Sequence, residues 1–295
     1  MGVLKIKTSE NKQVKKMSRL KKIIIAVASV LIILVIIEFV ISNSVIDVEN
    51  FTVKSKKIPE SFSGTKIVQI SDYHGHGGNY EDKLIKTVEN QNPDYIFITG
   101  DTVDKLKENT DNAKSFLEKI SKVGKCYLVW GNHDYEIGQE IQDKLKKCCE
   151  EKGITILEND YCTLEKNGEE ILLVGTDTTP LDERICNKLE KFKEQNPFTI
   201  WLHHYPEDFQ DIVTASQKAG CKADLVFTGH AHGGLFRFPF PNGLYAPGQG
   251  FLPEYTSGEY KFNDSEMIVS RGVGNSGYTK RFFDNFHLVV CTLER

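Results

Sequence analysis

The sequence lacks the short motifs that mark several common enzyme classes. It has no G-x-S-x-G, no Walker phosphate loop and no H-E-x-x-H, so the usual signals for a serine hydrolase, a P-loop enzyme and a zinc metalloprotease are missing. None of its seven cysteines stands in a C-x-x-C pair, so neither a zinc ribbon nor a thioredoxin-type redox site is expected. With 40% hydrophobic and 26% charged residues and no internal repeat, the composition is that of an ordinary globular protein.

Most of the chain also lacks an excess of positive charge. Residues 1–22 contain eight lysines and arginines and one acidic residue, but 29 basic and 39 acidic residues lie from position 42 onward. Proteins that bind long nucleic acids usually present a basic surface to the phosphates. The acidic balance of the larger part therefore disfavours a nuclease, and no nucleic-acid partner is expected.

One long apolar run stands near the N-terminus. The 19 residues from Ile23 to Ile41 include only Ser29 and Glu38 as polar side chains. At about 1.5 Å per residue, a helix of this length spans close to the ~30 Å hydrocarbon core of a bilayer. A cleaved signal peptide and a buried core helix are the alternatives. Because basic residues precede the run and Asp47 and Glu49 follow it, we predict a single-pass membrane anchor with a cytoplasmic N-terminus and an extracytoplasmic remainder.

From residue 66 onward, apolar runs of four to six residues alternate with amphipathic stretches of ten or more. In the stretch 80–91, for example, Leu84, Ile85 and Val88 fall on one face of a helix. This alternation predicts an α/β fold. The expected strands are 66–70, 95–98, 126–130, 171–174, 198–202, 225–227, 267–270 and 287–293, and the expected helices are 80–91, 111–122, 138–152, 182–195 and 207–220.

These observations predict four parts along the chain. The first two are a basic cytoplasmic segment at 1–22 and a transmembrane anchor at 23–41. A juxtamembrane connector at 42–65, with a short strand near 50–53, would lead into a large domain at 66–295. The oligomeric state is left open by the sequence.

Polar side chains that can bind metals follow five of the six expected strands between residues 66 and 227. Because ligands bind beyond the carboxyl ends of the strands in open α/β sheets, we expect these distant side chains to converge. The five segments are Ser71-Asp72-Tyr73-His74, Gly100-Asp101, Gly131-Asn132-His133-Asp134, His203-His204 and Gly229-His230-Ala231-His232.

The chemistry of these segments is that of a metal site. Seven of the eight histidines lie in or beside them, and His287 alone is interpreted as a packed strand residue. Imidazole, carboxylate and amide oxygen together suit zinc, manganese and iron, and the two oxygens of Asp101 could bridge two ions. Two metals about 3.5–4 Å apart can hold a bridging hydroxide and clamp an in-line displacement at phosphorus. A binuclear phosphoester hydrolase is therefore predicted.

The ordered motifs resemble those of calcineurin-like metallophosphoesterases, and the resemblance covers roughly residues 50–295. It implies a four-layer αββα sandwich of two sheets flanked by helices. The apolar N-terminal segment and the GHAHGG…VSRGVGNS ending are similar to the bacterial membrane-associated branch. The matching motifs are Asp72-Tyr73-His74, Gly100-Asp101-Thr102-Val103-Asp104, Gly131-Asn132-His133-Asp134, His204-Tyr205-Pro206 and Gly229-His230-Ala231-His232.

The resemblance further implies two divalent metal ions, with manganese favoured over iron or zinc. His133 would stabilise the phosphoryl group or protonate the leaving oxygen, and Asp104 would orient the His133 ring and raise its basicity. One ion would be bound by Asp72, His74, Asp101 and His232, and the other by Asp101, Asn132, His204 and His230.

Four further residues are candidates for contacting the substrate. His76 and His203 flank expected ligands, and His76 lies in a glycine-rich turn that departs from the family pattern and is interpreted as a flexible loop. Arg271 and Arg281 could contact a second phosphate or a headgroup, the alternative being ion-paired or surface arginines.

The resulting hypothesis is a membrane-anchored phosphoesterase that acts on phosphodiesters or phosphomonoesters by attack of a metal-bridging hydroxide. One alternative is a pyrophosphatase acting on lipid-linked or nucleotide-sugar substrates, since the anchor would hold the site near a membrane. Another is a non-catalytic envelope module that binds a phosphorylated ligand. The intact set of ligands argues against that module, because a pure binder need not retain His133 and both metal shells.

Overall fold

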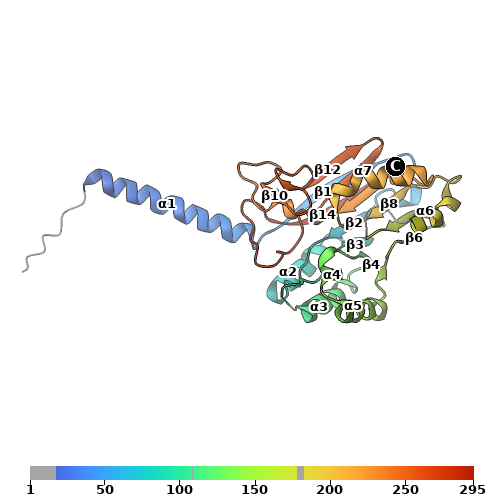
Figure 1. The fold of residues 1–295 in the computed structure, drawn as a ribbon, viewed down its shortest axis with the longest axis horizontal. Helices are drawn as coiled ribbons and strands as arrows, with labels where there is room; N and C mark the ends of the chain where they lie inside the picture. The colour runs from blue at the N-terminus through green and yellow to red at the C-terminus, as the bar shows by residue number, and fades with distance from the viewer. Residues whose placement is uncertain (1–17, 108, 178–182) are drawn as a thin grey trace, which may run out of the picture. The chain divides into compact units, whose positions relative to one another are not determined.

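The computed structural model describes residues 18–107, 109–177 and 183–295 (Figure 1). Lys5, Lys7, Lys12, Lys15 and Lys16 of the predicted basic segment lie outside the described residues, as does the first position of the expected helix 182–195. The chain divides into two units, the first ending at Glu38 and the second running from Phe39 to Arg295.

The first unit is dominated by one helix, α1 (Arg19–Ser42), whose last turn belongs to the second unit. This helix is long and apolar enough to cross a membrane, and some signal sequences meet the same criterion of length and composition. An N-terminal apolar helix is therefore present, as the sequence predicts.

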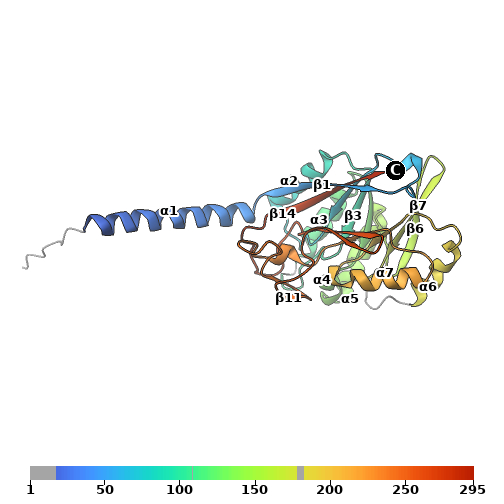
Figure 2. The same ribbon diagram turned by 90° about the horizontal axis from the view of Figure 1, so that it is seen from above.

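Two six-stranded mixed sheets form the centre of the second unit (Figures 1 and 2). The first sheet contains, in order, β1 (Ile46–Lys54), β14 (Phe286–Glu294), β2 (Lys66–Ile70), β3 (Tyr95–Thr99), β4 (Lys125–Val129) and β5 (Thr155–Ile156). The second contains β12 (Gly258–Phe262), β13 (Ser265–Val269), β9 (Leu225–Thr228), β8 (Thr199–Leu202), β7 (Glu169–Gly175) and β6 (Asp160–Lys166). A short hairpin joins β10 (Tyr245–Ala246) to β11 (Gly250–Phe251).

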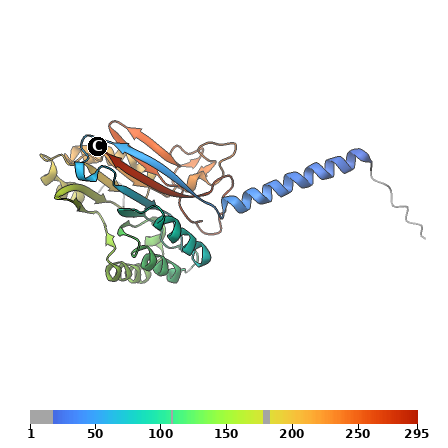
Figure 3. The same cartoon turned by 180° about the vertical axis from the view of Figure 1, so that it is seen from behind.

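Helices cover the outer faces of the two sheets (Figure 3). Against the first sheet lie α2 (Gly78–Glu89), α3 (Thr110–Ile120) and α5 (Gln139–Lys152), and against the second lie α6 (Glu183–Leu189) and α7 (Phe209–Lys218). The remaining helical segments are α4 (Asn132–Glu136) and the 3₁₀ turns η1 (Glu60–Phe62), η2 (Glu190–Phe192), η3 (Pro206–Asp208) and η4 (His232–Gly234).

Alternate side chains of each central strand enter different apolar clusters. In β3, Ile96 and Ile98 pack toward the helices, whereas Tyr95 and Phe97 pack into the cluster shared by the two sheets. Strands buried on both faces read as continuous apolar runs, which is why the sequence pattern locates them. The predicted α/β class is confirmed, and the layers in space are helices, first sheet, second sheet and helices.

The edge strands are where prediction from the sequence fails. Strands β6 and β12 are not predicted, because each carries charged or polar residues between its apolar ones and leaves one face partly exposed. Strand β1, expected as a short strand near 50–53 within a connector, instead pairs in parallel with β14 over all nine of its residues. Nine of the 24 residues in the segment 42–65 thus belong to the first sheet.

The shared cluster between the sheets leads to a stability prediction. Phe97 is fully buried there, so Phe97→Ala should lower the free energy of unfolding by about 3–5 kcal/mol through lost burial and a cavity. The measurement is denaturant unfolding of the chain in detergent. Leu252→Ala, at an exposed position, is the control and should change the same quantity by less than about 0.5 kcal/mol.

Candidate metal centre

The polar segments lie at the carboxyl ends of β2, β3 and β4 in one sheet and of β8 and β9 in the other. Backbone hydrogen bonds join the loops directly: Asp72 N donates to Gly100 O at 3.0 Å, and Gly229 N donates to His204 O at 3.0 Å. The expected convergence is therefore present, with contributions from both sheets.

The backbone is unusual at five of these side chains. Asp72, His74, Asp101, His230 and His232 all have φ between 46° and 63°, in the left-handed region that non-glycine residues seldom adopt. Each such residue costs on the order of 1–3 kcal/mol and is retained only where its surroundings enforce it. This strain is concentrated where the side chains converge.

Close approach of the loops requires glycine beside two of these residues. A Cβ at Gly131 would lie 2.2 Å from Asp101 Oδ1, and a Cβ at Gly229 would lie 1.8 Å from Ser71 Oγ. Any other residue would push the loops apart. The first positions of the G-N-H-D and G-H-x-H segments are thus glycine because no space remains there for a Cβ atom.

Three groups of side chains place their potential ligand atoms within 4.8 Å of one another. Asp101 lies between two of the groups, since its Oδ2 is 3.7 Å from His74 Nε2 and 3.4 Å from His204 Nε2. The groups are Asp72, His74 and His232; His74, Asp101 and His133; and Asp101, His204 and His230.

Several contacts within this cluster are compatible with a bound metal ion. Nε2 of His74 and Nε2 of His232 are 3.2 Å apart, and the same distance separates His204 Nε2 from His230 Nδ1. Two imidazole lone pairs face each other at such a distance only with a proton or a metal between them. Asn132 Oδ1 is buried and has no hydrogen-bond partner among the described residues, as expected of an oxygen that binds a metal. The donor set therefore fits divalent metal ions.

Burial and neighbouring charge set the protonation of the cluster. Burial lowers the pKa of His74 and that of His230 to about 3, so both rings are neutral and can donate a lone pair. Burial also raises the pKa of Asp72 to about 6. Burial disfavours the charged form of His204, but the charge of Asp101 outweighs it and raises the pKa of His204 to about 10. A proton on His204 thus compensates Asp101 in the metal-free protein.

His204 is oriented by the backbone. Its Nδ1 donates a hydrogen bond to Thr99 O at 2.7 Å, which directs Nε2 toward Asp101. A hydrogen bond of this kind at the far nitrogen is what fixes a metal-binding imidazole.

His133 is held differently from what the sequence predicts. Its Nδ1 accepts a hydrogen bond from Lys105 N at 3.2 Å, so the proton of the neutral ring lies on Nε2, which faces Ser276 Oγ at 3.2 Å. Asp104 Oδ1 is 3.7 Å from His133 Nδ1, which is too long for a hydrogen bond. Asp104 instead accepts from Leu106 N at 2.9 Å and so stabilises the loop beside His133.

Both candidate arginines are engaged within the protein. Arg281 is fully buried, with Nη2 2.7 Å from Gly274 O and 3.1 Å from His232 Nδ1. Arg271 forms ion pairs with Asp47 at 3.0 Å and with Asp284 at 3.3 Å. Arg281 therefore lies behind an expected ligand, and Arg271 links β1 to the loop before β14.

The two candidate histidines also differ from each other. His203 is fully buried, and its nitrogens lie 3.0 Å from Thr176 O and 3.0 Å from Asp208 Oδ2. Its ring therefore has no nitrogen left for a substrate. His76 is exposed and stacks on Tyr80, with ring centroids 4.1 Å apart.

Sequence reasoning missed Asp134 as a positioning residue. Its carboxylate accepts hydrogen bonds from Thr102 N and Gly131 N, both at 2.9 Å, and from Val103 N at 3.2 Å. It thereby joins the loops that follow β3 and β4. The fourth position of the G-N-H-D segment was the signal that could have found it.

The two mixed sheets and the buried His/Asp clusters at their strand ends define a metal-dependent phosphoesterase with a candidate binuclear site. The chain belongs to the calcineurin-like phosphoesterase family, whose model matches residues 65–234.

Three relatives illustrate the similarity. The chain is 28% identical to the uncharacterized metallophosphoesterase YkuE of Bacillus subtilis, over 84% of this chain and 86% of that one. It is 28% identical to the phosphodiesterase YaeI of Escherichia coli, over 63% and 65% of the two chains. It is 26% identical to a transmembrane protein with a metallophosphoesterase domain of Danio rerio, over 85% of this chain and 57% of that one.

The position of Asp101 between two ligand groups leads to a prediction about metal content. Asp101→Asn removes a charge that both groups share, so the variant should retain at most about one metal ion per chain after dialysis. Elemental analysis of the purified protein measures this. Asp264→Asn, at an exposed turn position, is the matched control and should retain the wild-type content. Full occupancy in Asp101→Asn would show that Asp101 is not shared.

Proposed function

We propose that this protein is a membrane-anchored enzyme that hydrolyses phosphodiesters or phosphomonoesters with two divalent metal ions, manganese being favoured. The observation that carries the proposal is the placement of Asp101 between two buried groups of histidine and carboxylate ligands. The name of the phosphodiesterase relative supports the diester as the first substrate to test.

Seven side chains of this cluster would hold the metals. When bound, the ions supply positive charge that attracts phosphate, and Lewis acidity that polarises its P–O bonds and activates water. One ion is assigned to Asp72, His74, Asp101 and His232, and the other to Asp101, Asn132, His204 and His230.

The protein's own residues orient the substrate and handle a proton. Because Lys105 N occupies Nδ1 of His133, the Nε2–H of that ring is the group that would turn from Ser276 Oγ to a phosphoryl oxygen or a leaving oxygen. His133 N donates to Asp101 Oδ1 at 2.8 Å, so the backbone of His133 is fixed to the expected bridging carboxylate. His133 is thereby held next to Asp101, where a phosphoester bound at the metals would meet it, and Asp104 positions its loop.

The first test of the proposal is turnover. The chain in detergent is stripped of metal, supplied with manganese and given an aryl phosphomonoester, an aryl phosphodiester or a nucleotide-sugar pyrophosphate, each with a chelator control. Metal-dependent hydrolysis of any one supports the proposal, and the ranking assigns the substrate class. With two metals bound and no turnover of all three, the non-catalytic module would replace the enzyme.

Removal of the His133 ring tests its role. His133→Ala should lower kcat by about 10²–10⁴, because a positioned proton donor is lost. Steady-state kinetics on the best of the three substrates, with metal content measured on the same sample, separates this loss from a loss of metal. Unchanged kcat with full metal content would rule out the role.

The membrane anchor is supported by α1 and by exposed aromatic side chains of the second unit. Phe39, in the last turn of α1, lies 6.2 Å from Phe282, which stacks on Phe236 at 5.2 Å. Exposed Phe, Leu and Tyr side chains gain by burial at the interface between membrane and water. We define the aromatic face as the exposed residues Phe236, Phe238, Tyr245, Phe251, Leu252 and Phe283. The proposed orientation, with a cytoplasmic N-terminus and an extracytoplasmic catalytic unit, follows from the basic residues before α1.

The aromatic face yields a binding prediction. In a fragment that starts at Phe39, the combined substitutions Phe238→Ser, Phe251→Ser and Leu252→Ser should reduce binding to lipid vesicles by about tenfold or more, since apolar area is lost from the contact. Co-sedimentation measures binding, and thermal unfolding verifies that the variant is folded. Equal binding by the folded variant would contradict a membrane contact at this face.

A further inference from the structure

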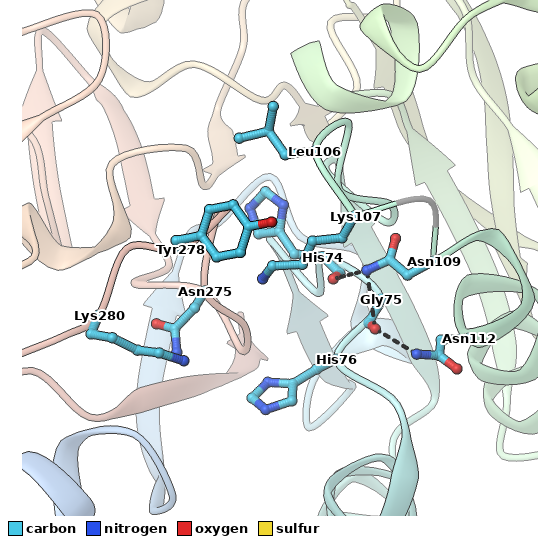
Figure 4. A pocket seen from close by; sticks show the side chains of 10 residues that line it. All are labelled: His74, Gly75, His76, Leu106, Lys107, Asn109, Asn112, Asn275, Tyr278 and Lys280. Carbon is cyan, nitrogen blue, oxygen red and sulfur yellow. Dashed lines mark hydrogen bonds between the residues drawn. The ribbon is translucent and has the colours of Figure 1, made fainter.

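A cavity of about 710 Å³ opens beside the metal centre (Figure 4). His74, an expected metal ligand, forms part of its wall, so the cavity lies directly beside the residues assigned to the metals. Its volume falls within the range of small-molecule sites, roughly 300–1,000 Å³. The cavity is therefore large enough for a substituent well beyond the scissile phosphate.

The walls of the cavity are positively charged. Lys107 and Lys280 extend into the space on either side of Asn275 and Tyr278 in Figure 4. None of the described residues that line the cavity is an aspartate or a glutamate. Lys107 is 3.4 Å from Asp104 Oδ2, and Lys280 has no ion-pair partner among the described residues. An anion in this space would meet two ammonium groups and no carboxylate on its walls.

The turn that forms the floor is fixed by side-chain amides. Asn109 Nδ2 donates to His74 O at 2.6 Å and to Gly75 O at 3.1 Å, and Asn112 Nδ2 donates to Gly75 O at 2.9 Å. The glycine-rich turn, which the sequence suggested to be flexible, is thus held on one side by two asparagines. A preformed wall lowers the ordering cost of binding.

The other positively charged side chains near the metal centre form ion pairs within the protein. Arg281 is fully buried against Asp284, and Arg271 pairs with Asp47 and Asp284. Lys105 pairs with Glu136.

We propose that this cavity is a second anion subsite, in which Lys107 and Lys280 bind a phosphate, pyrophosphate or carboxylate carried by the group esterified to the scissile phosphate. The inference rests on the proposed function. It specifies the substrate class of the enzyme as phosphoesters that carry a second anionic group. Leu106 and Tyr278, which are 59% and 82% exposed at the rim, offer apolar surface to the organic part between the two anions.

The test uses a matched pair of chromogenic phosphodiesters, p-nitrophenyl 3-hydroxypropyl phosphate and its analogue phosphorylated on the free hydroxyl. The manganese-loaded full chain in detergent should show a higher kcat/KM for the analogue. The double variant Lys107→Gln, Lys280→Gln should lower the analogue-to-parent ratio of kcat/KM by about tenfold or more, mainly through KM, because two charge-assisted contacts are lost. The double variant Lys107→Arg, Lys280→Arg should keep most of the ratio.

A control removes the same charge at a remote site. The double variant Lys125→Gln, Lys147→Gln, at exposed positions, should leave the ratio within about twofold, because screened surface charges act weakly at a distance. If the analogue-to-parent ratio of kcat/KM in Lys107→Gln, Lys280→Gln equals that of the unsubstituted protein and of the two other double variants, the subsite is overturned while the enzyme assignment stands. Absence of turnover of both diesters and of the aryl phosphomonoester would instead count against the proposed function. Calorimetric titration of the metal-stripped chain with inorganic pyrophosphate then tests the subsite apart from the metals, and binding unchanged in Lys107→Gln, Lys280→Gln would overturn it.

A last arm distinguishes the source of the anion. The same phosphorylated diester is attached to a diacylglycerol and presented in mixed micelles. A KM lower than that of the soluble analogue assigns the subsite to a lipid headgroup, and a similar KM assigns it to a soluble phosphoester.

Discussion

The structure depends on the burial of two carboxylates among five imidazole rings at the meeting point of two sheets. Asp72 and Asp101 are almost completely removed from water, and taking such charges out of water costs several kcal/mol each unless a counter-charge accompanies them. A proton on His204 can compensate only part of this charge. Divalent cations bound by the candidate ligands would supply the remainder, so metal binding would also stabilise the fold of this region.

Around this cluster, the supporting groups act on loops rather than on metals. Asp134 joins the turns that follow β3 and β4, Asp104 stabilises the loop that faces His133, and Arg281 lies against the back of His232. The two carboxylates restrict the backbone of loops that carry expected site residues, and Arg281 restricts the ring of His232 itself. Left-handed φ values at five of the cluster residues show that these constraints prevail over local preference.

The sequence predicts the central strands and the residues at their ends because strands buried on both faces give uninterrupted apolar runs. It misses β6 and β12, whose exposed faces dilute that pattern, and it underestimates β1. The sequence does not predict which groups contact the charged side chains. Nothing in the order of residues reveals that Arg281 is buried behind His232, or that Lys107 and Lys280, far apart in the chain, face one cavity.

Asn43, immediately after α1, contacts the loop that reaches the metal centre. Its Oδ1 accepts from Asn275 Nδ2 at 3.1 Å and from Arg281 N at 3.2 Å, and its Nδ2 donates to Arg281 O at 2.9 Å. The segment directly after α1 is therefore part of the structure around the candidate metal centre. A cut after Asn43 would free the loop beside His133 from these three hydrogen bonds, whereas a cut before Asn43 would leave them in place.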